Sequence, residues 1–266
     1  MKFDGYLIVT DMDNTLLSSK HKVSEENKAA IEYFMENGGL FTVATGRAVP
    51  AAYEHIKTFS INAPAILHNG AKLYDYETAT VLYEEFLADE RKNAVKIMHE
   101  KYPFLGFEVY SNEAAYIISE CQYTQRLRRR NYPEIYPADE SLYQKPWTKL
   151  LMIANKKVLN KYIPIYRQYD SGYAVRSGDH FFDIVADGVS KGMGLIKLCG
   201  LLGIDIKNTI AVGDNMNDIS LLETAGTSYA VENATADAKA AADFIAPSNN
   251  ENAIAYVIKE IEKRVE

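Results

Sequence analysis

The sequence has little of what marks secreted or membrane-bound proteins. Its 266 residues include only two cysteines, Cys121 and Cys199, which lie far apart in the chain. This usage predicts reduced thiols in an intracellular protein and not a disulfide framework. No apolar run approaches the length of a membrane-spanning helix, and the first residues lack the long apolar stretch of a signal peptide. We therefore expect a cytoplasmic protein.

Excess positive charge is also absent. The chain has 29 Lys and Arg residues against 36 Asp and Glu residues, which gives a formal net charge of -7. This balance argues against general binding to nucleic acid or to an anionic membrane. An anionic small-molecule substrate would have to find local positive charge. We expect a small-molecule partner, and a chain that is a monomer or a weak homodimer.

The sequence contains no internal repeat, no low-complexity segment and no Walker A motif. What it does have is ordinary for a globular protein. Hydrophobic residues make up 47% of the chain, ample for a core, and charged residues make up 24%. The length fits one large domain or two.

A short apolar run that ends at two carboxylates, Asp11 and Asp13, is the most informative stretch. The run, residues 7–10, is typical of a buried strand. In open α/β sheets, ligands bind outside the carboxyl ends of the strands. Two solvated aspartates in a loop are the simplest alternative. An EF-hand loop is excluded, because its glycine and final glutamate positions, counted from Asp11, hold Leu16 and Lys22.

Strands alternate with helices along the first part of the chain, which predicts a parallel sheet with right-handed crossovers. We expect Pro64–Leu67 to be the third strand of this sheet. The alternation breaks near Glu84 and resumes at Ser190. There Ser190 is an expected N-cap for a helix over Lys191–Leu202, and Gly203 is expected to end it.

The intervening segment has a different texture. Phe107–Tyr110 and Ala115–Ile118 alternate like an antiparallel pair, and further strands and helices follow. The predicted fold class is therefore α/β. A doubly wound, mostly parallel Rossmann-like sheet is formed by residues 1–84 and 187–266, and a separate α+β domain is inserted at residues 85–186.

Polar clusters follow three of the predicted strands and open one helix. Each cluster alone is a weak signal. Four of them at one edge of one parallel sheet are hard to explain by structure alone, and a lysine at a helix start opposes the helix dipole, which hints at a negative neighbour. The clusters are Asp11 with Asp13, Thr45-Gly46-Arg47, Ser190-Lys191, and Asp214 with Asn217 and Asp218.

These four clusters resemble the motifs of the haloacid dehalogenase-like (HAD) hydrolases. Asp11–Thr15 is similar to the DxDx(T/V) nucleophile motif, and Val43–Arg47 is similar to the second motif. Gly188–Gly192 resembles the third motif, and Gly213–Asp218 matches the GDxxND form of the fourth. The long insert between the second and third motifs resembles the type IIB cap of the Cof-like phosphatases.

The resemblance implies a Mg²⁺-dependent phosphatase that acts on small phosphorylated metabolites, in particular sugar phosphates. Asp11 would be the nucleophile, because a carboxylate is ionised at neutral pH and needs no base. Asp13 would be the general acid/base. Asp11, Asp214 and the backbone carbonyl of Asp13 would hold Mg²⁺. Met12, Thr45, Gly46, Arg47, Lys191 and Asn217 would bind the phosphoryl group or the substrate.

A few further residues are expected to support the site. Asp218 would orient Lys191, and His180 is a candidate substrate contact because it lies near the return from the insert. Asp183 stands where glutamate is common in the Cof-like subfamily. The basic run Arg126–Arg130 could bind an anion, although charge runs are usually solvated helix faces.

Two other functions remain open at this point. One is a sugar phosphomutase of the same superfamily, which passes the phosphoryl group to a sugar instead of to water. The other is a non-catalytic protein that binds phosphorylated metabolites, against which the presence of both Asp11 and Asp13 argues. Within the superfamily, Asp13 favours hydrolysis of phosphate esters over dehalogenation, because only the ester needs an acid at that position. We expect the inserted domain to select the substrate.

Overall fold

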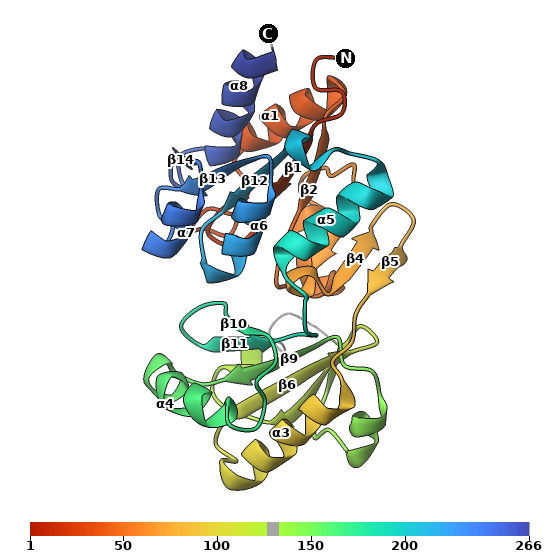
Figure 1. The fold of residues 1–266 in the computed structure, drawn as a ribbon, viewed down its shortest axis with the longest axis vertical. Coiled ribbons are helices and arrows are strands. Elements are labelled where there is room, and N and C mark those ends of the chain that lie inside the picture. The colour runs from red at the N-terminus through yellow and green to blue at the C-terminus, as the bar shows by residue number, and fades with distance from the viewer. Residues whose placement is uncertain (127–132, 266) are drawn as a thin grey trace. The chain divides into compact units, whose positions relative to one another are not determined.

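The computed structural model describes residues 1–126 and 133–265 (Figure 1). The described chain divides into two compact units. The first comprises Met1–Arg47, Ala52–Tyr83 and Ser190–Glu266, and the second comprises Ala48–Ala51 and Glu84–Val189. The side chains of the basic run Arg126–Arg130 lie outside the described residues.

The first unit is built on a five-stranded sheet in the order β14-β13-β12-β1-β2. All of its neighbouring strands are parallel, which confirms the predicted α/β class. Val212, Thr10 and Val43 stand in register across the three strands on the β2 side of the sheet, so these strands end at the same edge. The strands are β1 (Leu7–Thr10), β2 (Leu40–Val43), β12 (Thr209–Gly213), β13 (Thr227–Val231) and β14 (Phe244–Ala246).

Helices flank this sheet, and Figure 1 shows α1 beside α8 and α5 beside α6. Local capping explains where two of them begin. The Ser24 side chain accepts a hydrogen bond from the backbone N–H of Asn27 at the start of α1, and Ser190 accepts one from Met193 at the start of α5. The helices are α1 (Glu25–Glu36), α5 (Lys191–Leu202), α6 (Ile219–Thr224), α7 (Ala236–Ala241) and α8 (Ala253–Val265). A further helix, α2 (Val49–Ile56), has residues in both units.

The third predicted strand does not join the parallel sheet. β3 (Ala65–Leu67) pairs antiparallel with β4 (Lys72–Asp75), in a separate three-stranded sheet that β5 (Thr80–Glu84) completes. A single parallel bridge between Ala44 and Ile66 connects β3 to the end of β2. The prediction was wrong here because a three-residue apolar strand carries no signal of the direction in which it pairs.

The second unit contains a six-stranded sheet in the order β10-β11-β9-β6-β7-β8. Its β6 and β7 strands are antiparallel, as predicted. Residues from the helices α3 and α4 share one core with alternate strand residues such as Phe107 and Leu150, and Trp147 is fully buried in that core. The elements are α3 (Asp89–Lys101), β6 (Gly106–Ser111), β7 (Ala114–Ser119), β8 (Glu134–Ile135), β9 (Lys149–Ile153), α4 (Lys156–Tyr166), β10 (Ala174–Arg176) and β11 (Phe181–Ile184).

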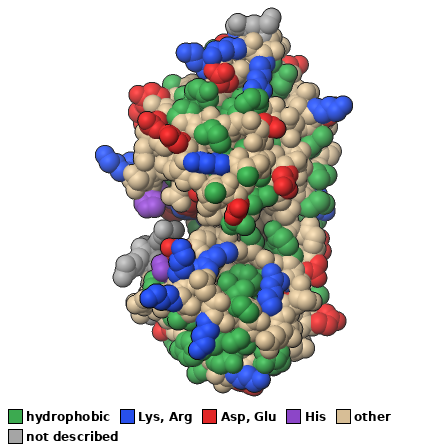
Figure 2. All heavy atoms as spheres, turned by 60° about the vertical axis from the view of Figure 1, so that its left-hand side comes forward, with side chains coloured by type: hydrophobic (Ala, Val, Ile, Leu, Met, Phe, Trp, Pro, Cys, Tyr) green, Lys and Arg blue, Asp and Glu red, His purple; other side chains and the backbone are tan. Residues whose placement is uncertain are grey.

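Short 3₁₀ turns complete the described secondary structure, and one of them, η6 (Met216–Asp218), lies within the predicted motif that follows β12. They are η1 (His68–Gly70), η2 (Thr124–Arg126), η4 (Glu140–Gln144), η5 (Ile206–Asn208) and η6 (Met216–Asp218). Among the described residues, every helix is too short or too polar to cross a membrane. The face drawn in Figure 2 carries both acidic and basic side chains and so has no single sign of charge.

Candidate active site

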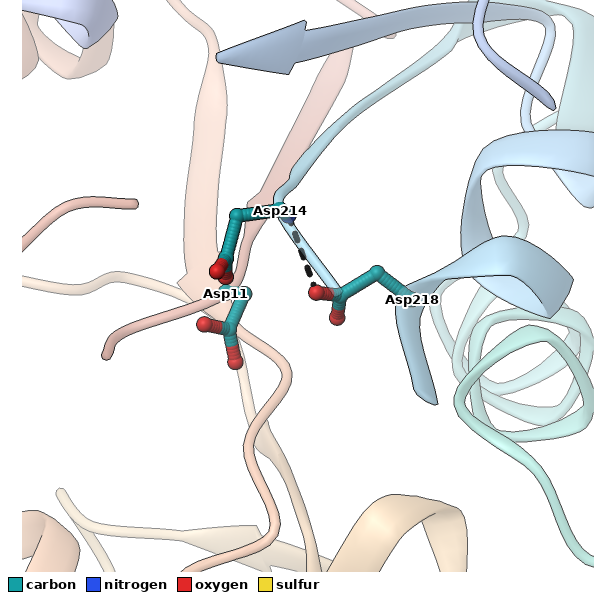
Figure 3. Close-up of side chains that lie close together, drawn as sticks. All are labelled: Asp11, Asp214 and Asp218. Atoms are coloured by element: carbon teal, nitrogen blue, oxygen red, sulfur yellow. Dashed lines mark hydrogen bonds between the residues drawn. The ribbon is translucent and has the colours of Figure 1, made fainter. Parts of the chain in front are cut away.

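Two carboxylates meet where the neighbouring strands β1 and β12 end. Asp11 follows β1 directly, and its backbone N–H donates to the carbonyl of Val212 at 2.8 Å. Asp214 follows β12 directly. Figure 3 shows these two side chains close together, with Asp218 reaching toward them from the next turn. One oxygen from each of the three carboxylates lies within 4.8 Å of the others.

Lys191 supplies the positive charge at this cluster. Its Nζ atom lies 2.5 Å from Oδ1 of Asp11 and 2.5 Å from Oδ1 of Asp218, and its side chain is 0% exposed. Burial by itself would lower the pKa of this amine, but the carboxylates of Asp11 and Asp218 outweigh burial and raise the pKa. Lys191 therefore stays protonated, and it explains why a cation stands at the start of α5.

Both carboxylate oxygens of Asp218 accept hydrogen bonds from other groups of the protein. Its Oδ1 atom accepts a hydrogen bond from Nζ of Lys191. Its Oδ2 atom accepts from the backbone N–H groups of Asp214 and Asn215 at 3.0 Å each. A Cβ atom at Gly213 would lie 2.5 Å from Cβ of Asp218, so this approach requires glycine. The arrangement fits the expected role of Asp218 in orienting Lys191.

Asp11 and Asp214 each use Oδ1 for a bond within the protein and have a second oxygen for a cation. Oδ1 of Asp11 accepts a hydrogen bond from Nζ of Lys191, and Oδ1 of Asp214 accepts one from the hydroxyl of Thr15 at 3.0 Å. Burial raises the pKa of Asp11 although Lys191 opposes it, and burial together with Asp218 raises the pKa of Asp214 to about 7. Burial is the larger cause of both shifts, and negative charge adds to it because three carboxylates face one ammonium group.

That donor set suits a divalent metal. Carboxylate oxygens are the ligands that Mg²⁺ prefers, and a bound cation would stabilise the ionised forms of Asp11 and Asp214. Asp218 is less suited to direct coordination, since its oxygens already bind Lys191 and two backbone N–H groups. The residues present therefore fit the predicted metal site.

Asp13 forms a two-point contact with Arg47. Oδ2 of Asp13 accepts from Nε at 2.8 Å, and Oδ1 accepts from Nη2 at 2.6 Å. Burial would raise the pKa of Asp13, but the hydrogen bonds and charge of Arg47 outweigh burial and lower it. Sequence reasoning assigned Arg47 to the substrate and missed this contact, which joins residues 34 positions apart.

The remaining predicted phosphate ligands lie around the loop that follows β2. The hydroxyl of Thr45 accepts from the backbone N–H of Arg47 at 3.2 Å. Asn217 donates to the side chain of Asn69 at 3.1 Å, and Asn69 lies against Gly46. Sequence reasoning treated Asn69 only as a turn residue and gave no role to Thr15, the donor to Asp214.

Met12 and His180 lie in different units. The carbonyl of Met12 accepts from the N–H of Leu17 at 2.8 Å, and the side chain of Met12 is buried in the first unit. His180 belongs to the second unit, where its ring stacks on Tyr123 at a centroid separation of 4.0 Å. Its Nδ1 atom lies 3.2 Å from the carbonyl of Ala154. The role of His180 in substrate binding stays a prediction.

Comparison with known proteins identifies the family. The sequence model of the haloacid dehalogenase-like hydrolases matches residues 8–258, nearly the whole chain. The chain belongs to this family. Phosphatase YwpJ of Bacillus subtilis is 30% identical, in an alignment that covers 96% of this chain and 99% of YwpJ. YwtE of the same organism, a 5-amino-6-(5-phospho-D-ribitylamino)uracil phosphatase, is 26% identical over 96% of this chain and 97% of its own.

The fold of this HAD hydrolase is also similar to that of a solved structure. The subclass IIB sugar phosphatase BT4131 superposes with a TM-score of 0.83, covering 96% of this chain and 98% of BT4131, at 22% identity. The fold is thus that of the IIB-capped, Cof-like branch, as the motifs predicted. The protein is a phosphatase-type hydrolase, and HAD hydrolases use a metal ion, which agrees with the buried carboxylates found here.

Metal binding should stabilise this HAD hydrolase most at alkaline pH. The pKa of Asp214 is about 7 in the fold and 3.8 ordinarily, so between these values the folded chain holds a proton that the unfolded chain has released. The stability of the metal-free protein should therefore fall as pH rises from about 4 to about 7. Protons and Mg²⁺ compete for the same oxygens. Saturating MgCl₂ should raise Tm by roughly 5–10 °C at about pH 8 and by much less at about pH 5.5.

Differential scanning fluorimetry at both pH values measures this effect, with KCl of equal ionic strength as the control for screening. Asp214→Asn should remove most of the shift at the higher pH. An equal shift at both pH values, or an unchanged shift in Asp214→Asn, would contradict the assignment of the cation to these carboxylates.

Proposed function

We propose that this HAD hydrolase is a Mg²⁺-dependent phosphatase of small phosphorylated metabolites, sugar phosphates in particular, and that it works through an aspartyl-phosphate on Asp11. The observation that carries the proposal is the buried group in which Lys191 contacts Asp11 and Asp218 beside Asp214. A protein that only binds phosphate would gain nothing from a buried carboxylate at that place, because two anions repel each other.

Asp11 is the nucleophile in this mechanism. Asp11, Asp214 and the carbonyl of Asp13 would hold Mg²⁺, whose charge would offset the repulsion between the phosphate and Asp11. Lys191, whose Nζ atom lies 2.5 Å from Oδ1 of Asp11, adds a second positive charge. An oxygen of Asp11 attacks phosphorus, the bond between phosphorus and the ester oxygen breaks, and the electron pair leaves with that oxygen.

Asp13 handles the protons. In the first step the protonated form of Asp13 gives its proton to the departing ester oxygen. The contact with Arg47 lowers the pKa of Asp13 and disfavours that form, so Arg47 must release Asp13 when substrate binds. In the second step the Asp13 carboxylate takes a proton from water, the water oxygen attacks phosphorus, and the bond to Asp11 breaks to release inorganic phosphate. Arg47, with its two contacts at 2.8 and 2.6 Å, fixes the direction of the Asp13 carboxylate before substrate enters.

The loop after β2 and the turn η6 bind the phosphoryl oxygens. Thr45 and Gly46 offer a hydroxyl and a backbone N–H, Met12 offers a backbone N–H, and Asn217 offers a carboxamide. Donors of this kind act where charge develops during transfer. They recognise only the phosphoryl group, so they do not select among leaving groups.

We assign that selection to the second unit, because its sequence is rich in tyrosine, a residue that suits a hydroxylated leaving group. Two similar proteins support this class of substrate. YwtE acts on a phosphorylated ribityl compound, and BT4131 is named a sugar phosphatase. His180 is the candidate contact of this unit, whereas Asp183 is buried and paired with Lys149.

A panel of phosphorylated metabolites tests the proposal. With MgCl₂ the protein should release inorganic phosphate from p-nitrophenyl phosphate and, with higher kcat/KM, from a hexose or pentose phosphate. EDTA should abolish both activities, and MgCl₂ in excess should restore them. Isomerised sugar phosphate without released phosphate would point to the phosphomutase instead. Tight binding without any turnover would point to a non-catalytic binding protein, and activity unaffected by EDTA would contradict the role of the metal.

A further inference from the structure

The turn η1 between β3 and β4 has an unusual backbone for a buried segment. His68 and Asn69 both adopt the left-handed conformation, with φ of 51° and 59°, and each is only 2% exposed. Residues other than glycine avoid this region unless the surrounding structure holds them there, and such residues cluster at functional sites. Neither residue has a part in the mechanism described above.

The backbone of this turn holds the loop that follows β2. The N–H of His68 donates to the carbonyl of Arg47 at 3.1 Å, and the N–H of Asn69 donates to the carbonyl of Thr45 at 3.0 Å. A Cβ atom at Gly46 would lie 2.9 Å from Oδ1 of Asn69. The carboxamide of Asn69 therefore occupies the space beside Gly46 that any other residue would fill.

The side chain of Asn69 reaches a second part of the site. Its Oδ1 atom accepts from Nδ2 of Asn217 at 3.1 Å, across 148 positions of sequence. The next residue, Gly70, fits closely against the start of α5, because a Cβ atom there would lie 2.0 Å from the carbonyl of Ser190. One short turn thus touches the loop after β2, the turn η6 and the residue that precedes Lys191.

We propose that Asn69 is a positioning residue for phosphoryl binding, which rests on the function proposed above. The carboxamide oxygen of Asn69 accepts a hydrogen bond from one N–H of the Asn217 side chain. This bond fixes the plane of the Asn217 carboxamide, whose remaining atoms face the phosphoryl oxygens. At the same time its backbone N–H sets the direction of the peptide groups from Thr45 to Arg47. The left-handed backbone of Asn69 makes both contacts possible from a single residue.

Asn69→Gly is the decisive variant, because glycine adopts the left-handed conformation without strain and only the carboxamide is lost. We expect the Kd of inorganic phosphate, measured by calorimetry in MgCl₂, to rise about tenfold, the usual effect of losing one hydrogen bond in a charged site. KM for p-nitrophenyl phosphate should rise similarly, with a smaller change in kcat. Asn112→Gly is the matched control, since Asn112 is an exposed asparagine with φ of 49° in the hairpin between β6 and β7.

A double-mutant cycle separates positioning from general damage. If Asn69 acts through Asn217, then Asn217→Ala should weaken phosphate binding much as Asn69→Gly does, and the double variant should be little worse than either single variant. Additive losses, or an Asn69→Gly protein that binds phosphate as the parent does, would overturn the proposal. Phosphate binding needs no turnover, so a parent that binds phosphate but hydrolyses nothing would refute the proposed function and leave this proposal standing.

Discussion

Asp11→Asn should lower turnover of p-nitrophenyl phosphate at least about 10⁴-fold, the scale seen when a covalent nucleophile is removed. The amide of asparagine has nearly the same shape as the carboxylate but cannot form the bond to phosphorus. The fold should persist, because burial raises the pKa of Asp11 and the loss of its charge removes a destabilised anion. Tm of the variant should therefore be close to that of the parent. Steady-state assays and thermal melts together measure both effects.

Comparison of Asp13→Asn with Asp11→Asn distinguishes the general acid/base from the nucleophile. Asp13→Asn should cost roughly 10²–10⁴-fold in turnover, the range for a positioned acid/base. An aryl phosphate has a good leaving group that needs little protonation, so Asp13→Asn should still accept phosphate on Asp11 and then release it slowly. Intact-mass analysis after acid quench should find phosphorylated protein in Asp13→Asn and none in Asp11→Asn. Asp4→Asn, at an exposed position, is the control. Turnover retained by Asp11→Asn would refute the mechanism.

Local signals were sufficient to predict several elements of the fold. The helix α5 begins and ends where Ser190 and Gly203 predicted, because an N-cap hydroxyl and a left-handed glycine act within one turn of the helix. The antiparallel pair of β6 and β7 follows in the same way from alternation along each strand. β3 was placed in the wrong sheet, since its partner is chosen by contacts outside the strand.

The candidate site likewise contains residues that the sequence could predict and contacts that it could not. Asp11, Asp214 and Lys191 follow strand ends or open a helix, so the topology of a parallel sheet brings them to one edge. The contacts of Asn69 with Asn217 and of Arg47 with Asp13 depend on side-chain directions after the chain has folded. An Asn-Gly pair has the same sequence in an exposed hairpin as in a buried turn, so nothing local distinguishes the two.

Lys191→Met should damage stability as well as activity. Methionine fills a similar volume, but it leaves the buried carboxylates of Asp11 and Asp218 without the ammonium group that lies 2.5 Å from each. Removing one partner of a buried ion pair costs about 3–5 kcal/mol, which corresponds to a fall in Tm of roughly 10 °C for a chain of this size. Turnover should be lost, since the phosphate and Asp11 then have one positive charge fewer between them.

The dependence on pH and metal makes this prediction specific. Without Lys191 the pKa of Asp11 should rise further, so the variant should lose more stability than the parent as pH increases through neutrality. MgCl₂ should recover part of the lost Tm, because it replaces positive charge, but it should not recover turnover. Lys263→Met, which breaks an exposed pair with Glu260, should change Tm little. If Lys191→Met melted like Lys263→Met at every pH, the buried charges at this site would not be balanced by Lys191, and the electrostatic basis of the proposed mechanism would fail.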